Sequence, residues 1–163
     1  MNVKFLIKMA LVASIYVVLT IWNPLSYSEI QFRISEVLVL LCFFRKEYIY
    51  ALTIGCIIAN IFSPLGIIDI VLGSLATFIS CLFIIISRNL FVASLFPVIF
   101  NALIVGFELN FVLHLPLITT IISVALGEFA VVSVIGVLLF RKLGQNKGFL
   151  ELIEAKERVE KDI

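Results

Sequence analysis

The chain has little charge and little of the chemistry that most enzymes use. Only 14% of its 163 residues are Asp, Glu, Lys or Arg, and 63% are apolar. A typical soluble domain is about half apolar and about a quarter charged, so this chain has too few polar groups to cover a surface in water. We therefore expect lipid to be the solvent for much of it, and an all-α integral membrane fold.

The chain also lacks the residue patterns of several functional classes. It contains no P-loop of the form GxxxxGK[ST] and no HExxH pattern, and His114 is its single histidine. The three cysteines, Cys42, Cys56 and Cys81, lie in apolar runs without a CxxC pair, so we expect small core residues rather than a disulfide framework or a thiolate metal site. These absences predict a protein that is not an enzyme, does not hydrolyse ATP itself, and needs no cofactor or metal.

Long apolar runs are what the chain does have. Lys4 and Lys8 precede the first run, but no small-x-small cleavage site follows, so we interpret it as a retained helix rather than a signal peptide. A transmembrane helix needs about 20 apolar residues. Polar and proline-containing breaks divide the chain into the segments 3–22, 34–44, 47–62, 65–86, 90–112 and 116–140. The two shortest, 34–44 and 47–62, are expected to form either a hairpin that just spans or a partly re-entrant pair.

The basic residues agree with six crossings. With both termini in the cytoplasm, every Lys and Arg except Arg33 lies on the inner side, as the positive-inside rule requires. The sequence therefore predicts a six-helix transmembrane domain over 1–142 and a short charged cytoplasmic tail over 143–163. Within the tail, 149–162 alternates Glu with Lys and Arg, and we expect a short solvated helix there.

Four acidic residues lie within the apolar segments, where charge is unfavourable. An ionised carboxylate at the bilayer centre opposes insertion by about 2.5–3.5 kcal/mol, and no Lys or Arg lies mid-membrane to neutralise these four. A functional role is the simplest reason for their presence. They are Glu36, Asp69, Glu108 and Glu128.

The predicted topology gathers polar side chains in the outer half of the bundle. Asn101 and Glu108 are seven residues apart on one helix and so share a face. Glu128 is expected to lie deeper. A convergent polar site under an apolar wall is the usual form of a ligand pocket. The polar residues near the outer ends of their segments are Glu36, Asn60 and Asp69.

Simpler roles remain open for three of these residues. Asp69 can favour the N-terminus of its own helix. Glu36 can pair with Arg33 at the loop edge, and Asn60 can hold helices together by hydrogen bonds.

The residue types of this cluster suggest a class of ligand. Several carboxylates and amides around one basic residue favour a ligand that is cationic or rich in N–H donors. A carboxylate accepts two hydrogen bonds from an amidine-like edge such as that of guanine. Aromatic side chains, among them Trp22, Tyr27, Phe32 and Phe107, could stack on a planar ring.

Two motifs resemble those of a known family. Residues 30–36 read IQFRISE, and residues 55–66 read GCIIANIFSPLG, followed by Asp69. Together they resemble the QueT family, whose members are substrate-binding S components of energy-coupling factor (ECF) transporters and import queuosine precursors. The resemblance covers about 1–142 and is strongest over 26–77.

The resemblance implies a six-helix bundle in a bacterial plasma membrane, with a pocket in its outer half for a deazaguanine such as 7-aminomethyl-7-deazaguanine. The loop 23–33 would be its lid. The bundle would dock on a transmembrane coupling subunit, and two separate ATPase subunits would power release. The family motif suggests Arg33, Glu36, Asn60 and Asp69 as substrate-binding residues, whereas Asn101, Glu108 and Glu128 rest on the depth argument.

Small residues at four-residue spacing allow helices to approach closely in lipid. Ala51, Gly55 and Ala59 share one face, and so do Ala10 and Ser14. Internal packing is the simplest role for both sets. The first helix of S components typically docks on the coupling subunit through Ala-x-x-x-Ala, a motif that Ala10 and Ser14 resemble.

Other functions stay open at this point. The chain could be an S component for another small cationic, vitamin-like substrate, or a membrane scaffold or assembly subunit. A self-sufficient proton-coupled carrier and an intramembrane enzyme are further alternatives. We expect no nucleic-acid partner.

Overall fold

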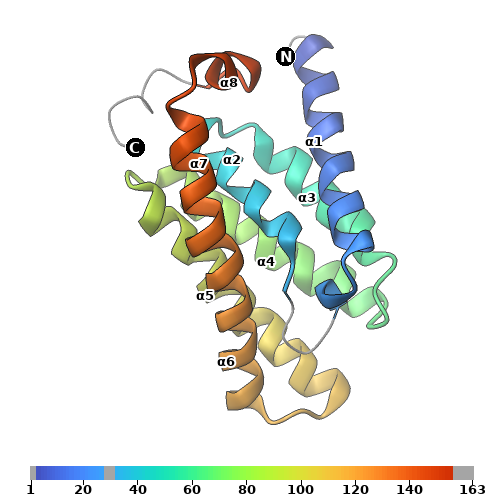
Figure 1. Cartoon of the computed structure of the whole chain (residues 1–163). Helices are drawn as coiled ribbons and strands as arrows, with labels where there is room; N and C mark the ends of the chain where they lie inside the picture. Colours follow the sequence, from blue (N-terminus) through green and yellow to red (C-terminus); the bar gives the residue numbers. More distant parts are fainter. Residues whose placement is uncertain (1–2, 28–31, 156–163) are drawn as a thin grey trace.

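The computed structural model describes residues 3–27 and 32–155, and this part of the chain is helical without a strand (Figure 1). The predicted all-α class is confirmed. The elements are α1 (Val3–Trp22), the 3₁₀ helices η1 (Pro24–Tyr27) and η2 (Ile34–Leu40), α2 (Leu41–Phe44), α3 (Tyr48–Asn60), α4 (Ile67–Ile86), α5 (Leu90–Leu113), α6 (Leu117–Glu128), the π-helix η3 (Phe129–Gly136), α7 (Val137–Gly144) and α8 (Lys147–Leu152).

Four helices are long and apolar enough to cross a membrane. They are α1 and α4 with 20 residues each, α5 with 24, and the continuous helix of α6, η3 and α7 with 28. The other two apolar segments are shorter, because α3 has 13 residues and η2 with α2 covers Ile34–Phe44. At 1.5 Å per residue in an α-helix and about 2 Å in a 3₁₀ helix, each of the two is about 20 Å long, against a hydrocarbon core of about 30 Å. Six crossings therefore stay a prediction.

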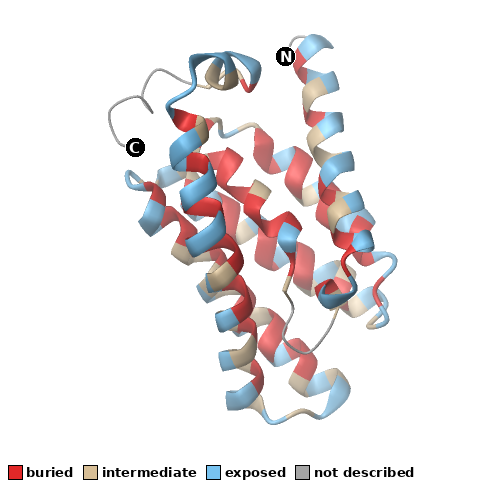
Figure 2. Ribbon diagram, viewed as in Figure 1, coloured by how far each residue is buried: buried red, intermediate tan, exposed pale blue. Residues whose placement is uncertain are grey.

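The helices pack side by side with their apolar interior faces together. α4 lies against α3 and α5, α5 against α6, and α1 against α3. The start of α1, the α2–α3 turn and α8 gather at one end, and the α5–α6 turn projects at the other (Figure 1). Buried residues face the interior of the bundle, and exposed ones line the outer sides of α1 and α7 (Figure 2).

The polar breaks in the sequence act as helix ends. The side chain of Asn89 accepts hydrogen bonds from the backbone N–H groups of Phe91 and Val92 and so caps α5. His114, exposed as expected, ends this helix in the left-handed conformation at φ 56°. Gly66 precedes α4 at φ 67°, a backbone conformation that glycine adopts without strain.

The small-residue face of α3 packs inside the protein. A Cβ atom on Gly55 would lie 3.1 Å from the carbonyl oxygen of Ala13 and 3.2 Å from the Cβ of Tyr16, so glycine lets α1 approach more closely than a larger residue would. Internal packing is confirmed for this face. Ala10 and Ser14, in contrast, are exposed, and the Ser14 hydroxyl donates a hydrogen bond to the Ala10 carbonyl.

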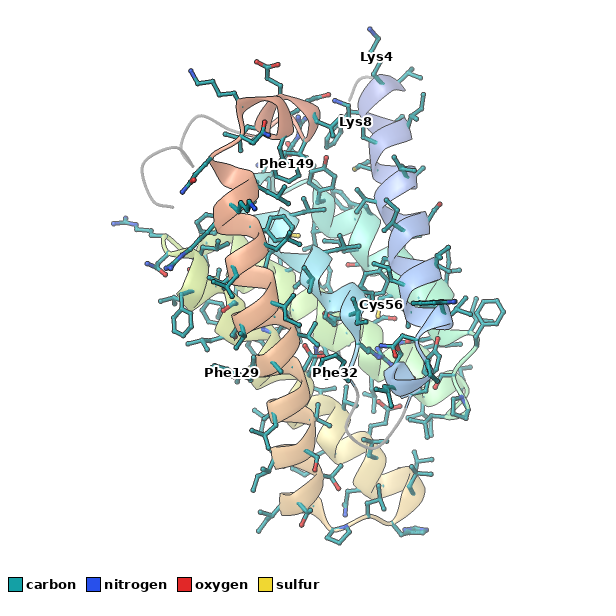
Figure 3. All side chains as sticks on the ribbon, viewed as in Figure 1. Lys4, Lys8, Phe32, Cys56, Phe129 and Phe149 are labelled. Atoms are coloured by element: carbon teal, nitrogen blue, oxygen red, sulfur yellow. The ribbon has the colours of Figure 1, made fainter. Side chains whose placement is uncertain are left out.

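Residues 149–154 fold back onto the end of the bundle. The Phe149 ring packs against Phe44 and Phe140 at centroid distances of 6.3 Å and 6.2 Å, and Ile153 is only 6% exposed. Phe149 lies at the same end of the molecule as Lys8 (Figure 3). The expectation of a solvated helix is therefore corrected here, because one face of this segment meets the apolar core. Residues 156–163 lie outside the described part.

Glu154 joins this segment to two others. Its Oε1 accepts a hydrogen bond from Lys8 Nζ at 3.0 Å, and its Oε2 accepts one from Arg45 Nη1 at 2.6 Å. Lys8 is on α1, and Arg45 is in the α2–α3 turn. We call Phe149, Ile153 and Glu154 the α8 clasp, because they tie α1, the α2–α3 turn and α7 together.

The clasp predicts a pH-dependent stability. Hydrogen bonds from Lys8 and Arg45 lower the pKa of Glu154 below its usual range. A carboxyl group with a lower pKa in the folded state stabilises the fold above its unfolded pKa, and this contribution is lost as the pH falls through the folded pKa. We expect Glu154→Gln to lower the melting temperature in detergent by about 1–3 °C at neutral pH, with the difference disappearing below about pH 4.

Scanning fluorescence over a pH series measures the melting temperatures of wild type and Glu154→Gln, with Glu151→Gln as the matched control. Glu151 is exposed and forms no ion pair within residues 3–27 and 32–155. Equal melting temperatures for the two variants at every pH would contradict the role of Glu154.

Candidate binding site

All seven predicted site residues are buried, each at most 5% exposed. They come from η2 and the loop before it and from α3, α4, α5 and α6, so residues far apart in sequence meet inside the bundle. They are Arg33, Glu36, Asn60, Asp69, Asn101, Glu108 and Glu128.

Arg33 and Asp69 form an ion pair with each other. Arg33 Nη2 lies 3.3 Å from Asp69 Oδ2 and 3.4 Å from Oδ1, and Arg33 Nε donates to the backbone carbonyl of Ser26 at 3.0 Å. The Glu36 carboxyl group, three residues along the chain, forms no hydrogen bond with the Arg33 guanidinium, and the two residues are joined only by the Glu36 backbone N–H, which donates to the Arg33 carbonyl at 3.1 Å. The simpler pairing of Glu36 with Arg33 is therefore replaced by a contact across 36 residues of sequence.

Asn60 belongs to the same group. Its Nδ2 donates to the backbone carbonyl of Asp69 at 2.8 Å and so joins α3 to α4, as the helix-holding interpretation of Asn60 predicted. A Cβ atom on Gly73 would lie 2.6 Å from both Asn60 Nδ2 and Asp69 Oδ1. Glycine at this position therefore makes room for the two polar side chains. Asp69 itself makes no capping hydrogen bond to the start of α4.

The segment between α1 and η2 is bonded to α3, and its two described parts are bonded to each other. The Tyr27 hydroxyl donates to the backbone carbonyl of Ala59 at 2.7 Å, and the Arg33 guanidinium lies 5.7 Å from the centre of the Tyr27 ring. Asn23 Nδ2 donates to the carbonyl of Phe32 at 2.6 Å. Of the expected lid 23–33, residues 28–31 lie outside the described part.

Glu36 has one oxygen that is held and one that is not. Tyr16 on α1 donates its hydroxyl to Glu36 Oε1. The Thr77 hydroxyl on α4 lies 3.4 Å from the same oxygen and 3.2 Å from the Gly73 carbonyl oxygen, and its one hydrogen serves one acceptor at a time. Oε2 is buried and has no hydrogen-bond partner among the described residues.

Glu108 and Glu128 have still fewer partners. Both oxygens of Glu108 and Oε2 of Glu128 are buried without a donor in the described part of the chain. The Asn101 amide lies beside the carboxyl groups of both Glu36 and Glu128. Glu108 lies close enough to Asp69 and Arg33 to interact with them electrostatically. Hydrogen bonds thus join Arg33, Asp69 and Asn60, and Glu36, Glu108 and Glu128 all lie within electrostatic range of Arg33.

The unpaired atoms of this group are almost all acceptors. Buried polar groups in proteins are normally hydrogen-bonded, and an unpaired buried carboxylate is costly. A set of convergent acceptors without donors is chemically suited to a molecule that supplies N–H groups and positive charge. These atoms are Glu36 Oε2, Asn60 Oδ1, Glu108 Oε1 and Oε2, and Glu128 Oε2.

Sequence reasoning missed the hydroxyl side chains around the acids. Tyr16 and Thr20 lie one helical turn apart in an otherwise aliphatic run, and Asp69, Gly73 and Thr77 repeat at four-residue spacing along α4. Thr20 Oγ1 and Ser35 Oγ share a hydrogen bond of 2.6 Å. The i, i+4 spacing of these polar residues was the signal that could have identified them.

The aromatic side chains proposed for stacking are placed differently from one another. Trp22 is 81% exposed and Phe107 55% exposed, so both face out of the bundle. The ring of Tyr27 is occupied by Arg33. Phe32 packs against the core, and Figure 3 shows it at about the height of Phe129, on the side of Cys56 away from the termini.

A helical chain with four helices of membrane length and a buried cluster of hydrogen-bond acceptors is a membrane protein with an internal polar site. The model of the QueT transporter family matches residues 6–145. The chain is also 37% identical over 158 residues to the queuosine precursor transporter QueT of Lactococcus lactis subsp. cremoris (strain MG1363), an alignment covering 86% of this chain and 92% of that protein. The chain therefore belongs to the QueT transporter family. No solved structure matches it.

The pairing of Arg33 with Asp69 predicts a large stability effect. Asp69→Ala leaves a buried guanidinium without its counter-ion, which costs about 3–5 kcal/mol. Replacing both partners by apolar residues, Arg33→Met with Asp69→Leu, is expected to cost less than Asp69→Ala alone, because no charge is left unpaired. Denaturant unfolding in detergent measures the free energy of unfolding of the single and the double variant.

Glu108→Gln is the contrasting variant. Glu108 has no hydrogen-bond donor in the described structure, so its substitution removes no protein contact and should leave the unfolding free energy within about 0.5 kcal/mol of wild type or above it. If Asp69→Ala were as mild as Glu108→Gln, the ion pair would not be structural.

Proposed function

We propose that this chain is the substrate-binding S component of an ECF-type importer and captures a queuosine precursor, 7-aminomethyl-7-deazaguanine or a related deazaguanine. The observation that carries the proposal is the buried group of carboxylate and amide oxygens that have no donor within residues 3–27 and 32–155. The name of the Lactococcus relative, a queuosine precursor transporter, supports the same class of substrate.

The chemistry of this ligand complements the cluster. The deazaguanine ring presents N1–H and an exocyclic amine side by side, and a carboxylate with two free oxygens accepts both hydrogen bonds. Glu108 is the carboxylate with two free oxygens. Glu36 and Glu128, each with a free Oε2 and joined by Asn101, suit the cationic aminomethyl group. Phe32, which precedes Arg33 and packs against the core, is the aromatic side chain we propose for contact with the ring.

Arg33 and Asp69 take a supporting part in this proposal. Because their opposite charges are paired with each other, their role is to hold the segment before η2 against α4 and to close the site on that side. Binding at Asn60 is limited to Oδ1, because its Nδ2 is bonded to the backbone.

The proposed architecture is a transmembrane domain over 1–142 with six crossings, followed by a charged tail, in a bacterial plasma membrane. Both termini are cytoplasmic, and the loop 23–33 covers the site from outside. The gathering of Lys8, Arg45 and α8 at one end supports this orientation, since basic residues concentrate on the cytoplasmic side.

The proposed protein partners are a coupling subunit and two ATPase subunits, which drive release of the bound substrate. A transmembrane coupling subunit docks on α1 through Ala10 and Ser14, whose exposure supports a contact there. Two ATPase subunits supply the ATP hydrolysis. The expectation of a non-catalytic role agrees with membership of a transporter family.

Isothermal titration of the detergent-purified chain with 7-aminomethyl-7-deazaguanine tests the proposal, with guanine and thiamin as comparison ligands. Selective, saturable binding of the deazaguanine is expected. Selective binding of thiamin would reassign the substrate, and a folded protein that binds none of the three would count against the S-component role.

Glu108→Gln is expected to weaken binding of the deazaguanine without unfolding the protein. Replacing one carboxylate oxygen by an amide removes a charge-assisted hydrogen bond worth about 1.5–3 kcal/mol, which corresponds to roughly 10- to 150-fold in Kd. Glu151→Gln, on exposed α8, is the matched control and should bind as wild type does. An unchanged Kd for Glu108→Gln would remove that residue from the site.

A further inference from the structure

Tyr16 is a polar residue of α1 that points into the bundle. Its side chain is fully buried, and its hydroxyl donates a hydrogen bond to Glu36 Oε1. Buried tyrosines normally place their hydroxyl on a partner, so the bond alone is not unusual. The identity of the partner is what matters, since Glu36 is one of the carboxyl groups with a free oxygen.

The two oxygens of Glu36 have different environments. Oε1 accepts a hydrogen bond from Tyr16 and lies 3.4 Å from the Thr77 hydroxyl, and Oε2 has no donor among the described residues. Rotation about the bond to a carboxyl group is soft, so donors on one oxygen decide where the other points. The Tyr16 hydroxyl therefore orients the free Oε2, and the Thr77 hydroxyl is a second, longer contact on the same side of the carboxyl group.

The position of Tyr16 is itself fixed. Its Cβ lies close to Gly55, where a Cβ atom would be only 3.2 Å away, and its backbone carbonyl accepts a hydrogen bond from Thr20 Oγ1 at 2.8 Å. Thr20 in turn shares a hydrogen bond with Ser35, the residue before Glu36. Two polar contacts one turn apart thus attach α1 to the element that carries the carboxyl group.

We propose that Tyr16 is a positioning residue for substrate binding, which holds the Glu36 carboxyl so that Oε2 faces the ligand. Tyr16 acts through Glu36 and does not touch the ligand. A carboxyl group that is already oriented loses less conformational freedom on binding, which is the general advantage of preorganisation. The ligand part of this proposal rests on the proposed function, and the orientation of Glu36 does not.

The first measurement needs no ligand. The infrared difference between wild type and Glu36→Gln isolates the carboxyl band of Glu36, and the same difference is recorded in the Tyr16→Phe background. Loss of the hydroxyl donor is expected to shift this band. Coincident bands in the two backgrounds would show that Tyr16 does not hold Glu36 and would overturn the proposal, whatever the protein binds.

The second measurement is isothermal titration with 7-aminomethyl-7-deazaguanine. Tyr16→Phe is expected to weaken binding roughly 5- to 30-fold, less than the loss of a direct hydrogen bond to a charged group, because Tyr16 acts only through Glu36. Thr77→Val, which removes the hydroxyl 3.4 Å from Glu36 Oε1, is expected to have a smaller effect in the same direction, because that hydroxyl is also shared with the Gly73 carbonyl. An unchanged Kd for Tyr16→Phe would overturn the positioning role even if its infrared band had moved.

Tyr48→Phe is the matched control. Tyr48 is as deeply buried, but its hydroxyl donates to the carbonyl of Ile153 at the opposite end of the bundle, at 3.3 Å. Both variants lose one buried hydroxyl, so a general effect on packing would weaken binding in both. Weaker binding in Tyr16→Phe alone, with the band shift, supports the proposal, and equal weakening in both contradicts it. If wild type binds no deazaguanine, the proposed function fails while the ligand-free measurement still decides the contact.

Discussion

A shortage of positive charge inside the bundle governs the arrangement of its polar residues. Within the described part of the chain, four buried carboxyl groups share one buried guanidinium, and that guanidinium is bonded to Asp69. An apolar interior offers no water to satisfy the remaining carboxyl oxygens, so they depend on hydroxyl and amide donors. Tyr16 donates to Glu36 Oε1, with the Thr77 hydroxyl nearby, whereas neither oxygen of Glu108 has a donor among the described residues.

This division separates the polar residues into two functional groups. Arg33, Asp69 and Asn60 complete one another and connect the segment before η2 with α3 and α4. Glu108 and Glu128 differ from them, because both oxygens of Glu108 and Oε2 of Glu128 accept no hydrogen bond from the described residues. Natural proteins depart from complete hydrogen bonding mainly at functional sites, and the incomplete group is where a ligand can contribute most.

The sequence was sufficient to predict the helices and the acidic cluster, and the reasons are energetic. Apolar runs of membrane length have few alternatives to helix, and Glu36 or Glu128 in such a run is costly enough to be informative. The partner of Arg33 was not predictable in this way, because Glu36 is near in sequence while Asp69 is near only after α4 has packed. The roles of Tyr16 and Thr77 were missed for a related reason, since a hydroxyl in an apolar helix is equally compatible with packing. The fold-back of Phe149 onto Phe44 and Phe140 likewise depends on tertiary contacts.

The helix that carries Glu128 changes its winding immediately after that residue. Residues Phe129–Gly136 are π-helical, between α-helical segments on both sides. A π turn contains about one residue more than an α turn, so closing it would turn the α6 half about 100° around the axis and advance it by about 1.5 Å. Glu128 would then move away from Asn101 and Glu36, while α7 and the α8 clasp beyond it kept their positions. Of the four buried acids, Glu128 is therefore the one whose direction depends on the number of residues in this π-helical segment, while α7 and the α8 clasp lie beyond it.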